Sequence, residues 1–504
     1  MDTKRLLLSA AAAIALCACD KWESPPDDPG VALARAQILA APALQVHGAT
    51  LNVPSTKYPT IGAALSSAKR GDLVRVAPGY YPECIVLVDG VTVEGMPGAM
   101  LDGSSCDLSV PAIVYADASV QQGATVRGFH ITGTKSPAVH LEGARAVEML
   151  DLFINTPPGT PPRTIFMNAS TRNVVSRCQL VGGGGIRLFS GSSATLSDLD
   201  IQYGPGPGVR SSESSFTLQD SRLLGNAGPA SVFILHGSRA TLSNNDIEGF
   251  TNGVRVDSGI AVDEVGWAPS QARLEGNRIH GNGEVGLWVA GRGSRVIGSG
   301  NTYEASGLSG VHVTGGATYV GERERMTGNT WDGLVVRGCD QRNRGNADGS
   351  FSPVILQERS LAVLNDFALD GNGADGLWAA CDAQVNLAHG SISHNVGRGA
   401  GVASTWDFGD GNQSYAPSRL GAVWTVFGSN RVGALLLEDS RMILGTLEEP
   451  GMNSFLDNWQ KAIGNRSSVP VFAQWNWFGT TDAAVIAGSF VGDVTYDPFL
   501  LHEP

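Results

Sequence analysis

Apolar and polar residues alternate in short runs that recur along most of the chain. In one recurring phrase, a glycine precedes an apolar, a variable and a second apolar residue. Alternation over so few positions is typical of a short β-strand with one buried face. Clear copies begin at Gly185, Gly253, Gly286, Gly310, Gly333 and Gly376, and weaker copies begin at Gly208, Gly401 and Gly433.

The spacing of these copies gives the size of the repeat. Gly286 and Gly310 lie 24 residues apart, and Gly310 and Gly333 lie 23 apart. Each unit also contains two further strand phrases, such as 240–243 (ATLS), and a Gly-Asn pair such as 281–282. Glycine and asparagine tolerate positive φ, so we expect corners at these pairs. Three short strands in about 23 residues predict one turn of a parallel β-helix, with turns stacked about 4.8 Å apart.

Other repeat architectures fit less well. A propeller blade needs about 40 to 50 residues, and a leucine-rich repeat has a different leucine pattern. If the β-helix prediction holds, Leu287, Val311, Leu334 and Leu377 lie above one another in a shared core.

Some steps are longer than one repeat. Gly253 to Gly286 spans 33 residues and Gly333 to Gly376 spans 43, so extra residues are expected to loop out. These excursions fall near 259–270 and 340–353, and a third is expected at 407–418. Loops on a solenoid usually border its binding face.

Both ends of the repeat region carry additional signals. Residues 60–70 (TIGAALSSAKR) place apolar side chains on one helical face, which predicts a helix that covers the first turn. Residues 58–61 (YPTI) with 71–81 (GDLVRVAPGYY), and 475–479 (WNWFG) with 496–500 (YDPFL), resemble the opening and closing segments of the pectin-lyase-like superfamily. The resemblance implies an all-β, single-stranded right-handed parallel β-helix over 51–504, with an N-terminal capping helix and a C-terminal cap. It implies a fold rather than an activity.

The composition argues against two classes of protein. The 504 residues carry a net charge of −13 and only 16% charged residues. This acidic balance argues against nucleic-acid binding, which requires clustered Lys and Arg. The 65 glycines argue against a mostly helical protein.

The first residues predict an export signal. A basic start at Lys4 and Arg5 precedes an apolar run at 6–18, which is shorter than the roughly 20 residues of a membrane-spanning helix. We therefore expect a signal peptide at 1–18. Residues 16–19 (LCAC) resemble the lipobox of bacterial lipoproteins, which implies lipidation of Cys19.

On this prediction, residues 19–50 are a tether, which opens with a polar, proline-rich stretch at 20–30. The protein is then held by lipid at a membrane of the cell envelope, in the periplasm or at the surface. The alternative is an ordinary secreted protein with a free Cys19.

Exported proteins are permitted disulfides. Cys84 and Cys106 lie 22 residues apart, about one turn, and Cys339 and Cys381 follow the glycines of neighbouring turns. Stacked residues fall within the Cα separation of about 4.4 to 6.8 Å that a disulfide requires. We predict both bridges, with buried thiols as the alternative. No cysteine or histidine spacing predicts a structural metal site.

The variable third residue of the strand phrase is expected to face outward. Guanidinium groups bind carboxylates and sulfates, and tryptophan faces stack on sugar rings. The resemblance implies that such an exposed sheet face is a polysaccharide groove. The alternative is an ordinary exposed strand surface. Read up successive turns, these positions are Arg187, Arg210, Arg255, Trp288, His312, Val335 and Trp378, of which all but Val335 are candidate ligand-binding residues.

A candidate catalytic group lies beside this row. Asp332 and Asp375 precede the glycines of adjacent turns, and His312 and Arg337 are near in register. Two carboxylates about 5 Å apart suit an acid/base pair or a Ca²⁺ ion. No other cofactor is expected. The alternative is that both Asp-Gly pairs simply form turns.

The motifs of familiar enzymes in the superfamily are missing. The His-Gly of polygalacturonases occurs at His236, His280 and His389, but their paired Asp-Asp occurs only at 27–28, in the tether. The sequence therefore favours a monomeric envelope lipoprotein that binds a polysaccharide or surface partner without catalysis. The alternatives are a lyase or glycoside hydrolase acting on an acidic glycan, and a structural adhesion protein.

Overall fold

The computed structural model describes residues 48–504 except 107–109, 134–136, 157–163, 203, 205, 226–227, 259–267, 346–350 and 410–411. The chain divides into two units, Met1–Val46 and His47–Pro504, and every described residue belongs to the second. The predicted signal peptide, Cys19 and nearly all of the tether lie outside the described residues. So does most of the excursion at 259–270.

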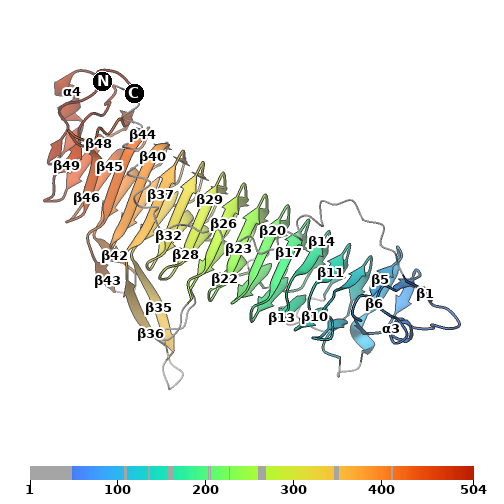
Figure 1. The fold of residues 1–504 in the computed structure, drawn as a ribbon. Coiled ribbons are helices and arrows are strands. Elements are labelled where there is room, and N and C mark those ends of the chain that lie inside the picture. Colours follow the sequence, from blue (N-terminus) through green and yellow to red (C-terminus); the bar gives the residue numbers. More distant parts are fainter. Residues whose placement is uncertain are drawn as a thin grey trace. The chain divides into compact units, whose positions relative to one another are not determined.

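The second unit is a parallel β-helix in which most turns contribute three short strands (Figure 1). Leu287 pairs in register with Val311, Val311 with Leu334, and Leu334 with Leu377. All four side chains are fully buried in one continuous core. The predicted fold class and the predicted stack are therefore confirmed.

The strands that contain the glycine phrase form one sheet, here called the 16-stranded sheet. Its strands, in order along the stack, are β4 (Ile85–Val86), β7 (Val114–Ala116), β10 (Val139–Glu142), β13 (Ile165–Asn168), β16 (Ile186–Phe189), β19 (Val209–Ser212), β22 (Ala230–Leu235), β25 (Asn252–Asp257), β28 (Val285–Ala290), β31 (Ser309–Thr314), β34 (Leu334–Arg337), β39 (Leu377–Ala380), β41 (Arg398–Ala403), β45 (Val432–Leu437), β48 (Lys461–Arg466) and β50 (Phe490–Val491).

The other two strands of each turn form two series, which the long strands β40 and β44 join into one 31-stranded sheet. The first series is β1 (Thr50–Val53), β2 (Leu73–Val76), β5 (Thr92–Gly95), β8 (Ala124–Arg127), β11 (Val147–Leu150), β14 (Asn173–Ser176), β17 (Ser193–Ser197), β20 (Ser215–Gln219), β23 (Arg239–Ser243), β26 (Gln271–Glu275), β29 (Arg295–Ser299), β32 (Thr318–Glu322), β37 (Ser360–Asn365), β40 (Ala383–Ser393), β44 (Arg419–Gly428), β46 (Arg441–Gly445), β49 (Val471–Ala473) and β51 (Val494–Thr495). The second series is β3 (Gly79–Tyr81), β6 (Ala99–Asp102), β9 (His130–Thr132), β12 (Phe153–Asn155), β15 (Gln179–Val181), β18 (Asp200–Gln202), β21 (Arg222–Leu224), β24 (Asp246–Glu248), β27 (Arg278–His280), β30 (Thr302–Glu304), β33 (Arg325–Thr327), β38 (Ala368–Asp370) and β47 (Ser454–Leu456), continued by the ends of β40 and β44.

The corners work differently from the sequence prediction. Gly281, Gly328 and Gly371 do adopt positive φ, but the asparagine after each one turns inward. The Oδ1 atom of Asn372 accepts from the backbone N–H and the Nδ2 of Asn329, at 3.1 and 3.0 Å. Further asparagines continue this buried ladder from turn to turn, which satisfies the backbone groups that a corner leaves unpaired. They are Asn395, Asn430 and Asn458.

One weak copy of the glycine phrase was misplaced. Gly401 pairs with Trp378, whereas Gly399 occupies the position of Gly376 one turn below. The inner residue of this turn is Ala400, which is smaller than the Leu or Val of its neighbours. Because Ala400 is small, the glycine phrase can be read as beginning at Gly399 or at Gly401. A shift of two residues preserves the alternation of inward and outward side chains.

Both ends of the stack carry helices. Helix α3 (Ile61–Leu65) buries Ile61, Ala64 and Leu65, and the Glu83 carboxylate accepts from the first two N–H groups at 3.0 Å each. It is shorter than the predicted 60–70 segment. Helix α4 (Ala483–Gly488) lies near the C-terminus, and a short 3-10 turn η1 covers Gly103–Ser105. Within the described ranges, no helix is long and apolar enough to cross a membrane.

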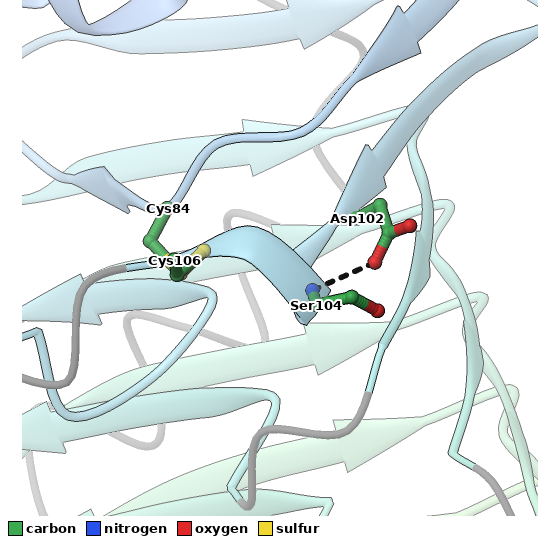
Figure 2. The surroundings of a disulfide bond; sticks show 4 residues. All are labelled: Cys84, Asp102, Ser104 and Cys106. Atoms are coloured by element: carbon green, nitrogen blue, oxygen red, sulfur yellow. Dashed lines mark hydrogen bonds between the residues drawn. A yellow bond between two sulfur atoms is a disulfide. The ribbon is translucent and has the colours of Figure 1, made fainter.

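The structure contains one of the two predicted disulfides. Cys84 and Cys106 form a disulfide with a Cα separation of 5.6 Å, which confirms one predicted bridge (Figure 2). The Cys339–Cys381 bridge is wrong, since both residues are free and buried. Arg337 pairs with Ala380, so Cys381 lies beside Gly338 and is one residue out of register with Cys339.

Two of the predicted excursions are β-hairpins rather than irregular loops. The first joins β35 (Cys339–Gly345) to β36 (Phe351–Gln357), and the second joins β42 (Thr405–Asp407) to β43 (Gln413–Tyr415). Both leave the 16-stranded sheet at the ends of its strands and project from the same side of the stack (Figure 1).

One core position carries an acid. Glu324 is fully buried in a ladder position that Asn245, Asn277 and Asn301 fill in earlier turns. Its carboxyl group accepts from Asn301 Nδ2 at 3.0 Å and from the Tyr319 hydroxyl at 2.7 Å. Burial raises the pKa of Glu324 to about 7, and the hydrogen bonds oppose that rise.

This acid makes stability depend on pH. The folded state holds the Glu324 proton more tightly than the unfolded chain, whose pKa is near 4.5. The contribution of Glu324 to the free energy of unfolding therefore falls by about 3 kcal/mol as pH rises from about 4.5 to 7. Glu324→Gln keeps the acceptor oxygen and removes the charge, so its gain in stability over the natural protein should grow over that range. Urea denaturation at several pH values measures this, and parallel pH profiles for the two proteins would contradict it.

Candidate functional site

The outward positions of the 16-stranded sheet form one unbroken row. Arg187 pairs with Arg210, and the pairing then runs through Phe233 to Arg255. It continues through Trp288, His312 and Val335 to Trp378. We call these eight residues the outward row. The sequence placed seven of them and missed Phe233, because its strand has no glycine anchor, although a step of 45 residues indicated an extra turn.

Side chains of the outward row stack on one another. The Arg255 guanidinium lies 4.5 Å from the centre of the Trp288 ring, and the His312 ring stacks on Trp288 at 5.8 Å with a 20° angle. The Trp288 Nε1–H group donates to the Thr314 hydroxyl at 3.2 Å. The expectation of open tryptophan faces is therefore wrong for Trp288, since neighbours one turn away approach its ring.

Trp378 is held in a similar way. The Arg398 guanidinium lies 4.2 Å from the centre of its ring. On the next turn, Gly401 provides the space that the ring occupies, because a Cβ at that position would collide with the indole. Arg398 was not predicted from the sequence, because it precedes the misplaced phrase.

Arg398 also determines the state of the acidic pair. Its Nε atom lies 3.0 Å from both carboxylate oxygens of Asp375, and its backbone N–H donates to the same carboxylate at 2.7 Å. Asp375 is buried and fully engaged. It holds the arginine in place, and both of its oxygens are occupied by these hydrogen bonds.

Asp332 lies one turn below and has fewer hydrogen-bond partners. Its Oδ1 atom accepts from the backbone N–H of Asp375 at 2.9 Å. Burial raises the pKa of Asp332 to about 6, against the lowering effect of this hydrogen bond. A carboxyl group with such a pKa can exchange a proton near neutral pH.

The four candidate catalytic residues are not brought together. Asp332 precedes β34, whereas Arg337 is the last residue of that strand, and His312 pairs with Val335 between them. Burial, with a smaller effect from Arg337, holds the pKa of His312 well below its usual range, so the imidazole is neutral. Within the described residues, no group of three or more His, Cys, Asp or Glu side chains is placed to hold a metal ion. The Asp375 carboxylate is paired with arginine, so the pair does not suit Ca²⁺.

The second hairpin packs against the end of strand β34. The Arg337 guanidinium lies 4.6 Å from the centre of the Trp406 ring and 5.7 Å from that of Phe408. Trp406 and Phe408 were not predicted as site residues. Burial lowers the pKa of Arg337, while Asp340 has the opposite effect. The hairpin therefore places two aromatic rings against Arg337, which lies two residues beyond Val335 of the outward row.

Aromatic residues extend the row below Arg187. Phe166 pairs with Arg187, His140 with Phe166, and Tyr115 with His140. The rings of neighbouring residues lie about edge-on, with centroids 5.0 to 5.5 Å apart. The sequence missed this part because its strands have no glycine phrase to mark them.

A known protein family has the same fold. Residues 112–262 and 258–407 match the family model described as a right-handed beta helix region. No curated protein sequence matches this chain.

Several solved structures are similar. A variant of the periplasmic alginate epimerase AlgG is 11% identical over 89% of this chain and 84% of its own, with a TM-score of 0.41. The A-module of mannuronan C-5 epimerase AlgE6 from Azotobacter vinelandii is 14% identical over 88% and 93%, with a TM-score of 0.32. Tailspike protein 3 of bacteriophage CBA120 is 14% identical over 86% and 57%, with a TM-score of 0.31. These similarities are too distant to assign an activity.

Proposed function

Because this chain belongs to the family of right-handed β-helix regions, we propose that it uses its 16-stranded sheet to bind an anionic polysaccharide without cleaving it. The observation that carries this proposal is the outward row, in which cationic and aromatic side chains succeed one another in register from Arg187 to Trp378. Adjacent members are about 4.8 Å apart. A regular array of this kind suits a ligand that is itself a repeating polymer.

The chemistry of the row favours a negatively charged glycan. Arg187 and Arg210 occupy neighbouring turns, and Arg255 lies two turns further along. Guanidinium groups bind carboxylate and sulfate groups through paired hydrogen bonds. The ring of Trp288 is already stacked, Arg187 is buried, and Arg255 is paired with Asp257 at 2.8 Å. The ring edges and the remaining guanidinium N–H groups are therefore the surface offered to the ligand.

Two observations argue against catalysis as the main role. Asp375 is neutralised by Arg398, and Arg337 lies at the opposite end of its strand from Asp332. An acid/base mechanism requires groups within hydrogen-bond reach of one reacting centre. The residues that could act in this way are spread along the sheet.

A second candidate function rests on Asp332. Its carboxyl group lies at the edge of the same sheet, and its pKa of about 6 suits a general acid or base. This residue supports a lyase or glycoside hydrolase acting on a polymer that lies along the outward row. If the protein retains no glycan, a purely structural role is the alternative that is left.

We also propose that the protein is anchored in the cell envelope through a lipid on Cys19. The support is the apolar run at 6–18 and the lipobox resemblance at 16–19.

The binding proposal predicts a specific loss of affinity. The full chain with Arg210→Ala and Trp288→Ala should bind an immobilised polyuronate at least about tenfold more weakly than the natural protein, because it lacks one charge and one aromatic edge. Surface plasmon resonance measures the affinity. The matched control is Arg239→Ala with Trp459→Ala, which removes the same residue types from exposed positions elsewhere. Equal affinity of the two double variants would exclude the outward row as the binding surface.

The catalytic alternative is tested on the same polyuronate. The binding proposal expects no new reducing ends and no unsaturated-uronate absorbance near neutral pH. Release of either product, together with its loss in Asp332→Asn, would establish the enzyme instead. Release that persists in Asp332→Asn would place the chemistry at another residue.

The lipid proposal predicts a defined mass. Expressed in a bacterial host, the mature protein should begin at Cys19 and carry a mass increment of covalently bound fatty acyl chains. Cys19→Ser should leave the protein without acyl chains and outside the membrane fraction. Intact-protein mass spectrometry decides the matter, and an unmodified Cys19 in the natural protein would refute the anchor.

A further inference from the structure

A second candidate site lies on the 31-stranded sheet, on a different face of the stack from the outward row. Strands β40, β44 and β46 surround a hollow of about 160 Å³. Since a water molecule occupies about 30 Å³ of liquid, the hollow accommodates a group several times larger than water. Its lining residues are Gln384, Asn386, Arg419, Leu420, Gly421, Arg441 and Ile443.

Two columns of side chains form this hollow. Gln384 pairs with Arg419, and Arg419 with Arg441. In the neighbouring column, Asn386 pairs with Gly421, and Gly421 with Ile443. Two guanidinium groups on consecutive turns therefore border one side, amide side chains lie below, and an apolar side chain lies above.

Gly421 keeps the hollow open. A Cβ at this position would approach only Asn386 Oδ1, at 3.6 Å, which is ordinary contact. The backbone there does not require glycine, because its φ is not positive. The missing side chain is therefore what leaves space between the amide of Asn386 and Ile443.

The two arginines have no internal counter-charge. Both are exposed, and neither forms an ion pair with any carboxylate of the described residues. Directly opposed like charges on neighbouring strands destabilise a sheet. Elsewhere in the same sheet, Glu94 lies between Arg75 and Arg127 and forms an ion pair with each of them, so the two arginines are not directly opposed. In a chain of net charge −13, an unpaired cationic pair beside a hollow points to an external anion.

We infer that this hollow binds a tetrahedral dianion, a phosphate or sulfate group, between the Arg419 and Arg441 side chains. Two adjacent positive charges match two negative charges, and each guanidinium presents a fork of N–H donors to tetrahedral oxygens. Gln384 and Asn386 supply further N–H donors from below. A carboxylate, which carries one charge, satisfies the pair less well.

The site is independent of the outward row. Its residues lie on the first strand series of the 31-stranded sheet, and none of them belongs to the 16-stranded sheet. Phosphate binding here can therefore fail while polyuronate binding succeeds, and the reverse.

The test uses the full chain with inorganic phosphate, inorganic sulfate and acetate as probes. Isothermal titration calorimetry at low ionic strength should show phosphate or sulfate binding at one site, with acetate at least about tenfold weaker. Arg419→Gln with Arg441→Gln should weaken dianion binding at least about tenfold. The matched control, Arg222→Gln with Arg325→Gln, removes two exposed and unpaired arginines from the same sheet and should leave binding unchanged.

A second variant tests the site from the other direction. Gly421→Asp places a carboxylate two residues from Arg419, the spacing at which Asp257 pairs with Arg255 at 2.8 Å. It should abolish phosphate binding and raise the melting temperature, because the built-in anion replaces the external one. Equal dianion affinity in the natural protein and the Arg419/Arg441 variant would overturn the inference. Acetate binding as tight as phosphate binding, or a Gly421→Asp variant that still binds phosphate, would also overturn it.

Discussion

Parallel, in-register pairing between consecutive turns determines both the core and the surface of this protein. Leu287, Val311, Leu334 and Leu377 stack because each strand forms backbone hydrogen bonds with the strand one turn away. A shift by one residue would turn the whole apolar set of a strand outward, so register is strongly specified wherever the inner face is buried. The same register that builds the core places Arg255 beside Trp288 and Arg419 beside Arg441. Core and surface columns are two consequences of one constraint.

The interior is not wholly apolar, and its polar groups are arranged by the same stacking. Asn329, Asn372 and Asn395 follow one another at one corner, each accepting from the backbone of the turn below. A ladder of this kind satisfies buried N–H groups that have no strand partner. Glu324 takes an asparagine position in another ladder, where Tyr319 helps to satisfy it. Burial rather than contact with another charge gives this acid its unusual pKa.

Much of the fold could be predicted from the sequence, because glycine phrases at a fixed spacing report the turns directly. The outward row followed from that spacing, except at Phe233, whose strand lacks the glycine. Contacts that depend on side chains from other turns could not be predicted. The engagement of Asp375 by Arg398 and the stacking of His312 on Trp288 arise from register across turns, and a two-residue error at Gly401 hid the first. The Cys339–Cys381 error has the same origin, since one residue of offset separates a disulfide from a pair of thiols.

Disulfide cross-linking on the protein surface measures the register between turns directly. Thr217 and Thr241 are directly opposite on β20 and β23, and both side chains face outward. Cysteines at these two positions fall within the Cα range of a disulfide and should cross-link on mild oxidation. Cysteines at Thr217 and Ser243, which also faces outward but lies two residues further along, should remain reduced under the same conditions. Preferential cross-linking of the Thr217/Ser243 pair would contradict the register, and with it the outward row and the arginine pair.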